Sequence, residues 1–206
     1  MSDDAVRRGR GRPRTIDRDQ AITTAMQTWW LEGVEAVSVN AISRRTGLSK
    51  SSLYREFGGE DGLMAAALNR YRELAVVPLL GLLQPDREPL DVEGTLALLV
   101  HGSTEPHGLP PGCFFTKLRL TVARLGKETA DGVRRLLAER LRAFERWYGT
   151  VLARGLGNPA LTAEEGGRYL DAQLTLLLVR MAAGDSVEAV RTDAMRALSV
   201  LWTPSS

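Results

Sequence analysis

The 206-residue chain contains few of the residues on which disulfide scaffolds, metal sites and many enzymes depend. Its single cysteine excludes a disulfide within the chain, which fits a reducing cytoplasm, the location that we expect. The sequence has only two histidines, and it contains no phosphate-binding loop, no dinucleotide-binding fingerprint and no cluster of metal ligands. No run of 18 apolar residues occurs, so we expect neither a transmembrane helix nor a membrane partner.

These absences argue against catalysis. Cys113 can be paired with His101 or His107 as a nucleophile and its base, but no acidic residue or oxyanion motif accompanies them. The N-terminus is rich in arginine, and no apolar segment follows it, so we do not interpret it as a secretory signal. We predict a protein that is not an enzyme and that has no catalytic residue, no metal and no cofactor.

Positive charge is concentrated at the N-terminus. Residues 1–72 contain 12 Lys and Arg against 9 Asp and Glu, whereas the remaining residues contain 15 against 16. Residues 1–15 are polar and rich in glycine, and we predict a flexible basic arm there. Within it, Arg10-Gly11-Arg12-Pro13 is similar to the core of an AT-hook, whose arginines enter the minor groove of A·T-rich DNA. The alternative is a solvated tail that binds phosphates without sequence preference, and in either case we expect Arg10 and Arg12 to strengthen DNA binding.

Residues 38–57 have the pattern of two short helices separated by a tight turn. The first has an apolar face, and Ser38 is its predicted N-cap, because a serine hydroxyl can accept from an orphaned backbone N–H. Gly47 supplies the positive φ that lets the chain reverse direction. Ser49 is the predicted cap of the second helix, whose Leu53 faces inward. The pattern predicts a helix-turn-helix.

The outer face of the second helix is polar and basic, which suits insertion into the major groove of DNA. Serine and arginine reach base edges there, and tyrosine and lysine reach phosphates. An ordinary surface helix is the alternative interpretation, since this geometry also occurs without DNA. The side chains for which we predict DNA contacts are Lys50, Ser51, Ser52, Tyr54 and Arg55 on this helix, with Ser38, Asn40 and Arg44 on the preceding one.

From about Ile16 to Leu68 the sequence resembles the DNA-binding domain of the TetR family of bacterial repressors. The similarity covers the segment AITTAMQTWWLEGVEAVSVNAI, the turn and the segment LYREF, where the family usually has L-Y-x-H-F. Glu56 replaces the family's usual histidine, and Glu60-Asp61 stand where a lysine commonly begins the next helix. The resemblance implies a transcriptional regulator that acts as a homodimer.

Residues 60–83 are predicted to form a long helix that connects two domains. Its second half, LAVVPLLGLL, is apolar on nearly all sides, so we expect it to be buried between the domains. Pro78 cannot donate a helical hydrogen bond and clashes with the preceding turn, so we expect the helix to kink or stop nearby.

The rest of the chain has helical periodicity and no strand signal, so the expected fold class is all-α with about nine helices. We predict a three-helix DNA-binding domain over residues 16–59 and a helical regulatory domain for ligand binding and dimerisation over residues 60–206. Thr162-x-x-Glu165 and Asp185-x-x-Glu188 have the form of capping boxes that open the last two helices. Those two helices are apolar enough to form a four-helix bundle with a second copy. The predicted dimer residues are Leu170, Leu174, Leu177, Leu178, Met181, Val190, Ala194, Ala197, Leu198 and Leu201.

Together these features predict a repressor that binds a palindromic operator in double-stranded DNA as a homodimer and is released by a small-molecule effector. Cys113 offers an alternative, because a thiol at a predicted helix N-terminus, one turn from Lys117, favours a thiolate that responds to electrophiles or oxidants. An inert buried thiol and a regulator without a small-molecule ligand are further alternatives. The candidate ligand residues, which mix apolar bulk with polar tips, are His101, Cys113, Phe114, Trp147 and Tyr148.

Overall fold

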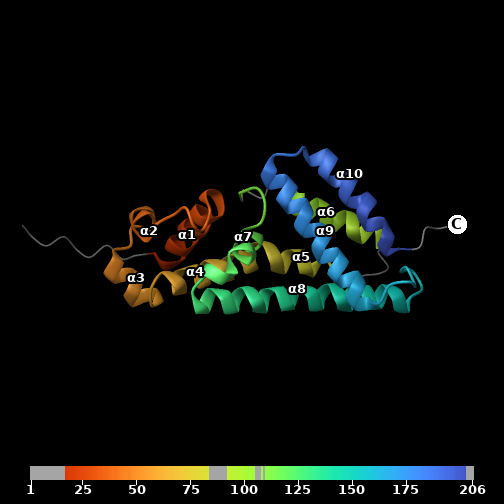
Figure 1. Ribbon diagram of the computed structural model, residues 1–206, viewed down its shortest axis with the longest axis horizontal. Helices are drawn as coiled ribbons and strands as arrows, with labels where there is room; N and C mark the ends of the chain where they lie inside the picture. Colours follow the sequence, from red (N-terminus) through yellow and green to blue (C-terminus); the bar gives the residue numbers. More distant parts are fainter. Residues whose placement is uncertain (1–16, 84–91, 105–107, 109, 203–206) are drawn as a thin grey trace, which may run out of the picture.

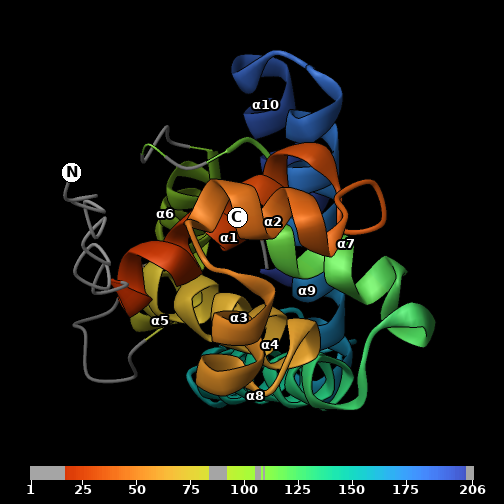
Figure 2. The same ribbon diagram turned by 90° about the vertical axis from the view of Figure 1, so that its left-hand side faces the viewer.

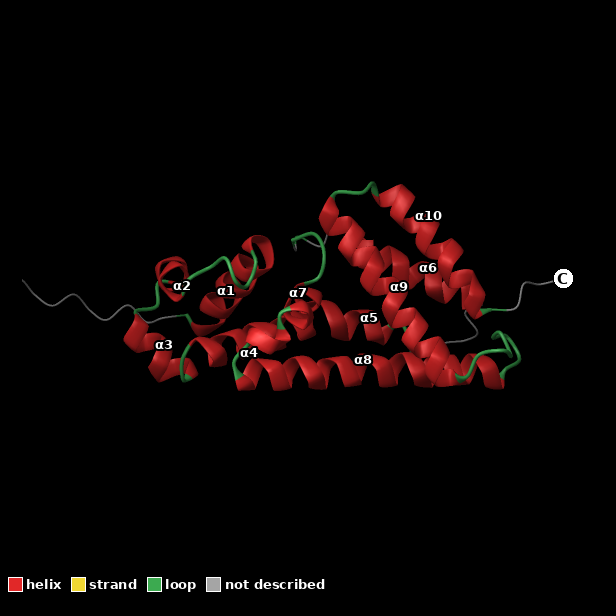
Figure 3. Cartoon of the chain, in the orientation of Figure 1, coloured by secondary structure: helices red, strands yellow, loops and turns green. Residues whose placement is uncertain are grey.

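The computed structural model describes residues 17–83, 92–104, 108 and 110–202. The described chain is an elongated arrangement of helices without a named strand (Figures 1 and 3). The predicted all-α class is therefore confirmed. If α4, a π-helical turn and α5 are counted as one continuous helix, the described residues form nine α-helices, as expected. The α-helices are α1 (Arg18–Glu32), α2 (Val39–Thr46), α3 (Lys50–Phe57), α4 (Glu60–Tyr71), α5 (Val77–Gly81), α6 (Val92–Thr104), α7 (Phe114–Leu120), α8 (Lys127–Ala153), α9 (Ala163–Ala183) and α10 (Val187–Leu198).

The first three helices form a compact unit at one end of the molecule (Figure 2). The predicted caps are confirmed, since the Ser38 hydroxyl accepts from Ala41 N at 3.3 Å and the Ser49 hydroxyl accepts from Ser52 N at 3.1 Å. Gly47 ends α2 with φ 71°, which a residue with a Cβ rarely adopts. The helices enclose fully buried apolar side chains, namely Trp29, Ile42 and Leu53 among others.

The connecting helix departs from regular geometry just before Pro78. Residues Arg72–Val76 form a π-helical turn, in which the Val77 N–H reaches the Arg72 carbonyl instead of the Glu73 carbonyl. A proline lacks the N–H that would continue the regular ladder, and a wider turn relieves its clash with the preceding residues. The helix thus continues to Gly81. The expectation that this segment is buried throughout was wrong, because Leu74 and Val77 are each 44% exposed.

The remaining helices pack beside this connecting helix and against one another. The long α8 runs beside α4 and α5, α9 packs across α8, and α10 packs with α6 and α9 (Figure 1). Asp185 does not form the predicted capping box. Ser186 caps α10 instead, because the Asp185 carboxylate accepts from Arg180 Nε at 2.6 Å. The capping box of Thr162 and Glu165 is present. No helix in the described ranges is long and apolar enough to span a membrane.

Packing between the predicted domains is continuous. One hydrophobic cluster includes α1–α4 together with residues of α7 and the first half of α8, and Trp30 of α1 stacks on Phe114 of α7 with ring centroids 6.4 Å apart. A second cluster fills the space between α6, α8, α9 and α10. The first three helices are therefore attached to the regulatory helices by shared core side chains as well as by the connecting helix.

Candidate nucleic-acid interface and regulatory cavities

The recognition surface, defined here as the outer face of α3, faces solvent. Leu53 is fully buried beneath it, whereas Lys50, Ser51, Tyr54 and Arg55 are exposed. The fifth predicted residue, Ser52, is half-buried. Leu53 and the half-buried Phe57 hold this eight-residue helix against the core, and five of its side chains are exposed. The predicted contact residues of α3 therefore lie together on one accessible surface.

Two contacts restrict side chains on this surface. The hydroxyls of Ser51 and Ser52 each lie 2.9 Å from the hydroxyl of the cap residue Ser49. Arg55 Nε donates to a carboxylate oxygen of Glu56 at 2.9 Å, and both side chains are solvent-accessible. Such an exposed ion pair contributes only about 0.2–1 kcal/mol, so Arg55 remains available to a stronger acceptor.

The supporting helix α2 presents its predicted residues beside α3. Ser38, Asn40 and Arg44 are all exposed, although the Ser38 hydroxyl is also the cap of α2. Arg45 forms an ion pair with Glu32 of α1. Arg10 and Arg12 lie outside the described residues.

The start of α4 interlocks with the start of α8. The Asp61 carboxylate accepts hydrogen bonds from the backbone N–H groups of Glu128 at 2.9 Å and Thr129 at 3.0 Å, and from the Thr129 hydroxyl at 2.6 Å. Burial alone raises the pKa of Asp61, but these hydrogen bonds outweigh it and hold the pKa below its ordinary value. Because Gly126, at the N-cap of α8, has no side chain, Asp61 caps α8 in its place, and a Cβ at Gly126 would overlap the carboxylate.

This contact also gives Asp61 of the acidic pair Glu60-Asp61 a structural role outside its own helix. No side chain caps the first turn of α4 itself, and the negative charge of Asp61 is directed at α8. The N–H groups at the start of α4 are therefore not occupied by that carboxylate. The sequence offered one signal for this contact, namely that glycine stands where α8 needs an N-cap side chain.

Comparison with known proteins finds similarity to one family of regulators. Residues 21–67 match the family described as "Bacterial regulatory proteins, tetR family". The HTH-type transcriptional repressor ComR of Escherichia coli (strain K12) is 27% identical over 204 residues, covering 98% of this chain and 96% of ComR. The N-terminal part of the chain is therefore similar to the TetR family, and the similarity to ComR extends over nearly its whole length. The HTH-type repressor BdcR of the same organism is 38% identical over 77 residues, which cover 37% of this chain and 39% of BdcR.

Solved TetR-family structures extend the similarity to the whole fold. The TetR family transcriptional regulator CifR, solved with a 26-base-pair double-strand operator DNA, superposes with a TM-score of 0.76 at 27% identity. The superposition covers 93% of this chain and 100% of CifR. The reduced form of Escherichia coli NemR has the same fold, with a TM-score of 0.76 at 14% identity over 92% of this chain and 99% of NemR. The matched family region contains α2 and α3, so the recognition surface lies within the part of the chain that matches the family.

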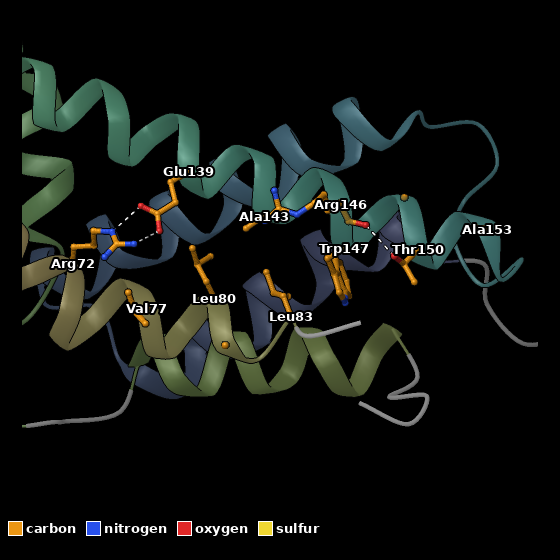
Figure 4. Close-up of a pocket in the computed structure, with 12 residues that line it drawn as sticks. Arg72, Val77, Leu80, Leu83, Glu139, Ala143, Arg146, Trp147, Thr150 and Ala153 are labelled. Carbon is orange, nitrogen blue, oxygen red and sulfur yellow. Dashed lines mark hydrogen bonds and ion pairs between the residues drawn. The ribbon is translucent and has the colours of Figure 1, made fainter. Parts of the chain in front are cut away.

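Two cavities flank the connecting helix. The α8 cavity, of about 800 Å³, lies between α5 and α8 (Figure 4). Arg72 spans its rim and donates from Nε and Nη2 to the two Glu139 carboxylate oxygens at 2.7 and 2.5 Å, and Arg146 and Trp147 also line it. The Pro78 cavity, of about 700 Å³, lies on another side of the same helix and has an uncharged lining.

The structure separates the five predicted ligand residues. Trp147 lines the α8 cavity, whereas Phe114 and Tyr148 are fully buried in the two core clusters. His101 is exposed and is not among the lining residues of either described cavity. Cys113 is 4% exposed, lies behind the Pro78 cavity next to Gly112, and has its Sγ 3.0 Å from the Tyr71 hydroxyl. These residues therefore do not form one site.

The predicted surroundings of Cys113 are only partly present. Cys113 lies at the N-terminus of α7 as expected, and its Sγ caps the helix by accepting from Thr116 N at 3.3 Å. Lys117, however, points towards α1, where its ammonium group donates to the Trp30 carbonyl. Burial raises the pKa of the neighbouring Tyr71 well above its ordinary value, so this hydroxyl stays protonated beside the thiol.

Most of the predicted dimer residues lie inside the subunit. Their burial contradicts an interface role, because side chains that pack against α6 and α8 of their own chain are not accessible to a second copy. Leu178 and Met181 instead line the Pro78 cavity, and Ala197 is half-buried and accepts a hydrogen bond from the Tyr169 hydroxyl at its carbonyl. The buried residues are Leu170, Leu174, Leu177, Val190, Ala194, Leu198 and Leu201. The periodicity identified the apolar side of each helix but not the partner that covers it.

Proposed function

We propose that this protein is a repressor of the TetR family that binds a palindromic operator as a homodimer and is released by a small molecule, not an enzyme. The observation that carries the proposal is the exposed recognition surface of α3, with Arg55 and Tyr54 accessible above the buried Leu53. ComR and BdcR are named as repressors, and CifR was solved on operator DNA, which supports the same activity for this chain.

The dimer that we propose uses the outer side of α9. One stripe of this helix carries four exposed apolar residues, spaced four, three and four positions apart. They are Ala172, Leu176, Val179 and Ala183. Leu176 is 52% exposed, which is unusual for leucine on an otherwise well-packed helix. A two-fold axis through this stripe would bury it and hold two recognition helices about 34 Å apart, the spacing of successive major grooves.

Release of the operator, in this proposal, depends on the connecting helix. The π-helical turn lies between α4, which packs on α1 and α3, and α5, which lines both cavities. A ligand beside α5 that prefers a different position of this helix would move α4 and change the separation of the two recognition surfaces. The ligand can change operator affinity only by as much as its own affinity differs between the DNA-binding and the released position of the helix.

DNA binding is tested with fluorescently labelled fragments tiled across the DNA that flanks the gene. We expect sequence-preferring binding that weakens with salt, and Arg55→Ala should weaken it about 5- to 100-fold, the loss of one base-directed arginine. Arg135→Ala, which removes an exposed arginine on α8, is the matched control and should leave the affinity unchanged. Equal affinities for Arg55→Ala and the wild type would refute the proposal.

The proposed dimer is tested by sedimentation. Leu176→Glu places a charge in the α9 stripe and should shift the protein to a monomer that binds the operator weakly. Leu31→Glu provides the control, since Leu31 is 62% exposed at the end of α1, which packs on α2, α4 and α7. A Leu176→Glu variant that sediments as a dimer would show that another surface pairs the subunits.

Regulation through Cys113 is the second candidate, and the contacts of this residue do not favour it. The thiol is buried and Lys117 is turned away from it, so only the short helix α7 is left to promote a thiolate. We expect iodoacetamide to alkylate Cys113 at least tenfold more slowly in the folded protein than in urea. Faster alkylation in the folded protein would restore the thiol as a sensor.

A further inference from the structure

The recognition helix α3 contains one acidic residue, Glu56. It is exposed together with the predicted DNA-contact residues of the same helix. DNA carries a negative charge on every phosphate, so a carboxylate on a surface that binds DNA lowers the affinity for every sequence. A favourable contribution of Glu56 must therefore lie in something other than affinity.

The contact between Glu56 and Arg55 uses one particular part of the guanidinium. Arg55 Nε donates to a Glu56 carboxylate oxygen at 2.9 Å. The side chain of Glu56 is 38% exposed and that of Arg55 is 67% exposed, so the carboxylate is the more enclosed member of the pair. The N–H groups on Nη1 and Nη2 have no acceptor among the described residues. Glu56 thus holds the guanidinium at Nε and leaves both Nη groups for a partner.

Arg55 also lies at the centre of the recognition surface. The helical rotation turns it about 200° from Leu53, which is fully buried beneath α3, so it points almost directly away from the core. The same rotation places Ser51 and Ser52 on its two sides. A side chain in this position is directed at base edges when α3 lies in the major groove.

A guanidinium held at Nε matches one base better than the others. Guanine presents two acceptors, N7 and O6, on its major-groove edge, whereas adenine and thymine each present one and cytosine presents a donor. The two Nη groups of an arginine bind the guanine acceptors side by side. A phosphate is the competing acceptor, and it is the same in every sequence. Arg55 can reach a phosphate only by leaving Glu56 or by bringing the phosphate close to the Glu56 carboxylate, so Glu56 opposes this alternative.

We propose that Glu56 is a positioning residue that makes Arg55 selective for guanine, while it lowers the affinity for all sequences. The inference rests on the proposed DNA-binding function and names the base that the central arginine reads. Specificity is a difference between two affinities, so a residue that weakens all binding raises specificity when it weakens binding to the wrong sequences more. Glu56 leaves the guanine contact intact, because guanine binds the Nη groups, and it disfavours the phosphate contact.

The base is identified by selecting duplexes of random sequence with the full-length wild-type protein. The bound duplexes should share a guanine at a position where the Arg55→Ala variant has no preference. Affinities are then measured for four duplexes that differ only in the base pair at that position, and we expect the wild type to prefer guanine by about 5- to 100-fold. If Arg55→Ala keeps every guanine preference of the wild type, the assignment of guanine to Arg55 is wrong.

The role of Glu56 is tested with two substitutions and a matched control. Glu56→Gln keeps a neutral acceptor, and Glu56→Ala removes the acceptor. The preference for guanine should fall at least threefold in Glu56→Gln and further in Glu56→Ala, because binding to the other three duplexes rises more than binding to the guanine duplex. Glu60→Gln removes a charge four residues away that does not contact Arg55, so it should change all four affinities by the same factor. Unchanged preference in both Glu56 variants, or an equal loss of preference in Glu60→Gln, would overturn the positioning role.

The contact itself is tested with 7-deazaguanine, which lacks the N7 acceptor. The wild type should bind a duplex with this base at the selected position about 2- to 10-fold more weakly, the loss of one of two hydrogen bonds, and Arg55→Ala should bind both duplexes equally. An equal loss in the two proteins would show that another side chain reads the guanine. The two proposals fail differently: a wild type without sequence preference refutes the proposed function, whereas a guanine preference that depends on Arg55 but not on Glu56 refutes this inference alone.

Discussion

The recognition surface and the centre of the molecule use charged residues in opposite ways. On α3, Arg55 is exposed and pairs only with its neighbour Glu56. At the centre, Arg140 of α8 is 3% exposed, and its guanidinium lies 2.6 Å from Asp171 of α9 and over the ring of Phe115 at 5.3 Å. Arg119 of α7 reaches the same carboxylate at 3.3 Å. Arg55 is available to a partner, whereas Arg140 is enclosed by partners from its own chain.

This difference implies that substitutions in the two regions have separable effects. A buried charge that loses its partner destabilises the folded state, because water cannot replace the partner. An exposed charge that loses its neighbour is hydrated again at little cost. We therefore expect central variants to change the free energy of unfolding and α3 variants to change operator affinity. The three predictions below test that separation, from the largest expected effect to the smallest.

Asp171→Ala should have the largest effect. It leaves the buried Arg140 without an acceptor, for which we expect a loss of about 3–5 kcal/mol in unfolding free energy, measured by urea denaturation. The double variant Arg140→Met/Asp171→Leu removes both charges and is the control, since it should recover most of the loss. Similar instability of the single and double variants would mean that packing at this position matters more than charge.

Asp61→Ala tests the contact between α4 and α8. Losing the cap of α8 should cost about 2 kcal/mol of stability. Because the folded-state pKa of Asp61 lies below its unfolded value, its contribution is fully present above the unfolded pKa and is lost as the pH falls through the folded pKa. The difference between wild type and variant should therefore shrink below about pH 4. A difference that is constant from pH 7 to pH 2 would exclude the carboxylate as its source.

Glu56→Gln tests the recognition surface with the smallest change. It frees Arg55 from its ion pair and removes a negative charge close to the phosphates, so operator affinity should rise about 2- to 5-fold. Thermal stability should stay within about 1 °C of the wild type, as for other exposed substitutions. Glu145→Gln, an exposed substitution on α8, is the control for the change in overall charge. A loss of stability without a gain in affinity would contradict the separation of the two regions.

The sequence by itself determined the local features of this protein. Ser38, Ser49 and Thr162 cap helices because a hydroxyl and a backbone N–H three residues away are brought together by the helix geometry alone. The inward position of Leu53 and the exposed positions of Tyr54 and Arg55 follow from the same 100° rotation per residue. The helix-turn-helix was predictable for this reason.

Only the tertiary structure decided which surface each apolar stripe meets. Leu174 and Leu198 satisfy the pattern of a dimer interface, yet they pack against their own subunit, because periodicity gives the direction of a side chain and not the identity of its neighbour. The contacts of Asp61 and Trp30 could not be predicted from the sequence for the same reason. Their partners, Thr129 and the Pro78 cavity, come from distant segments that only folding brings together.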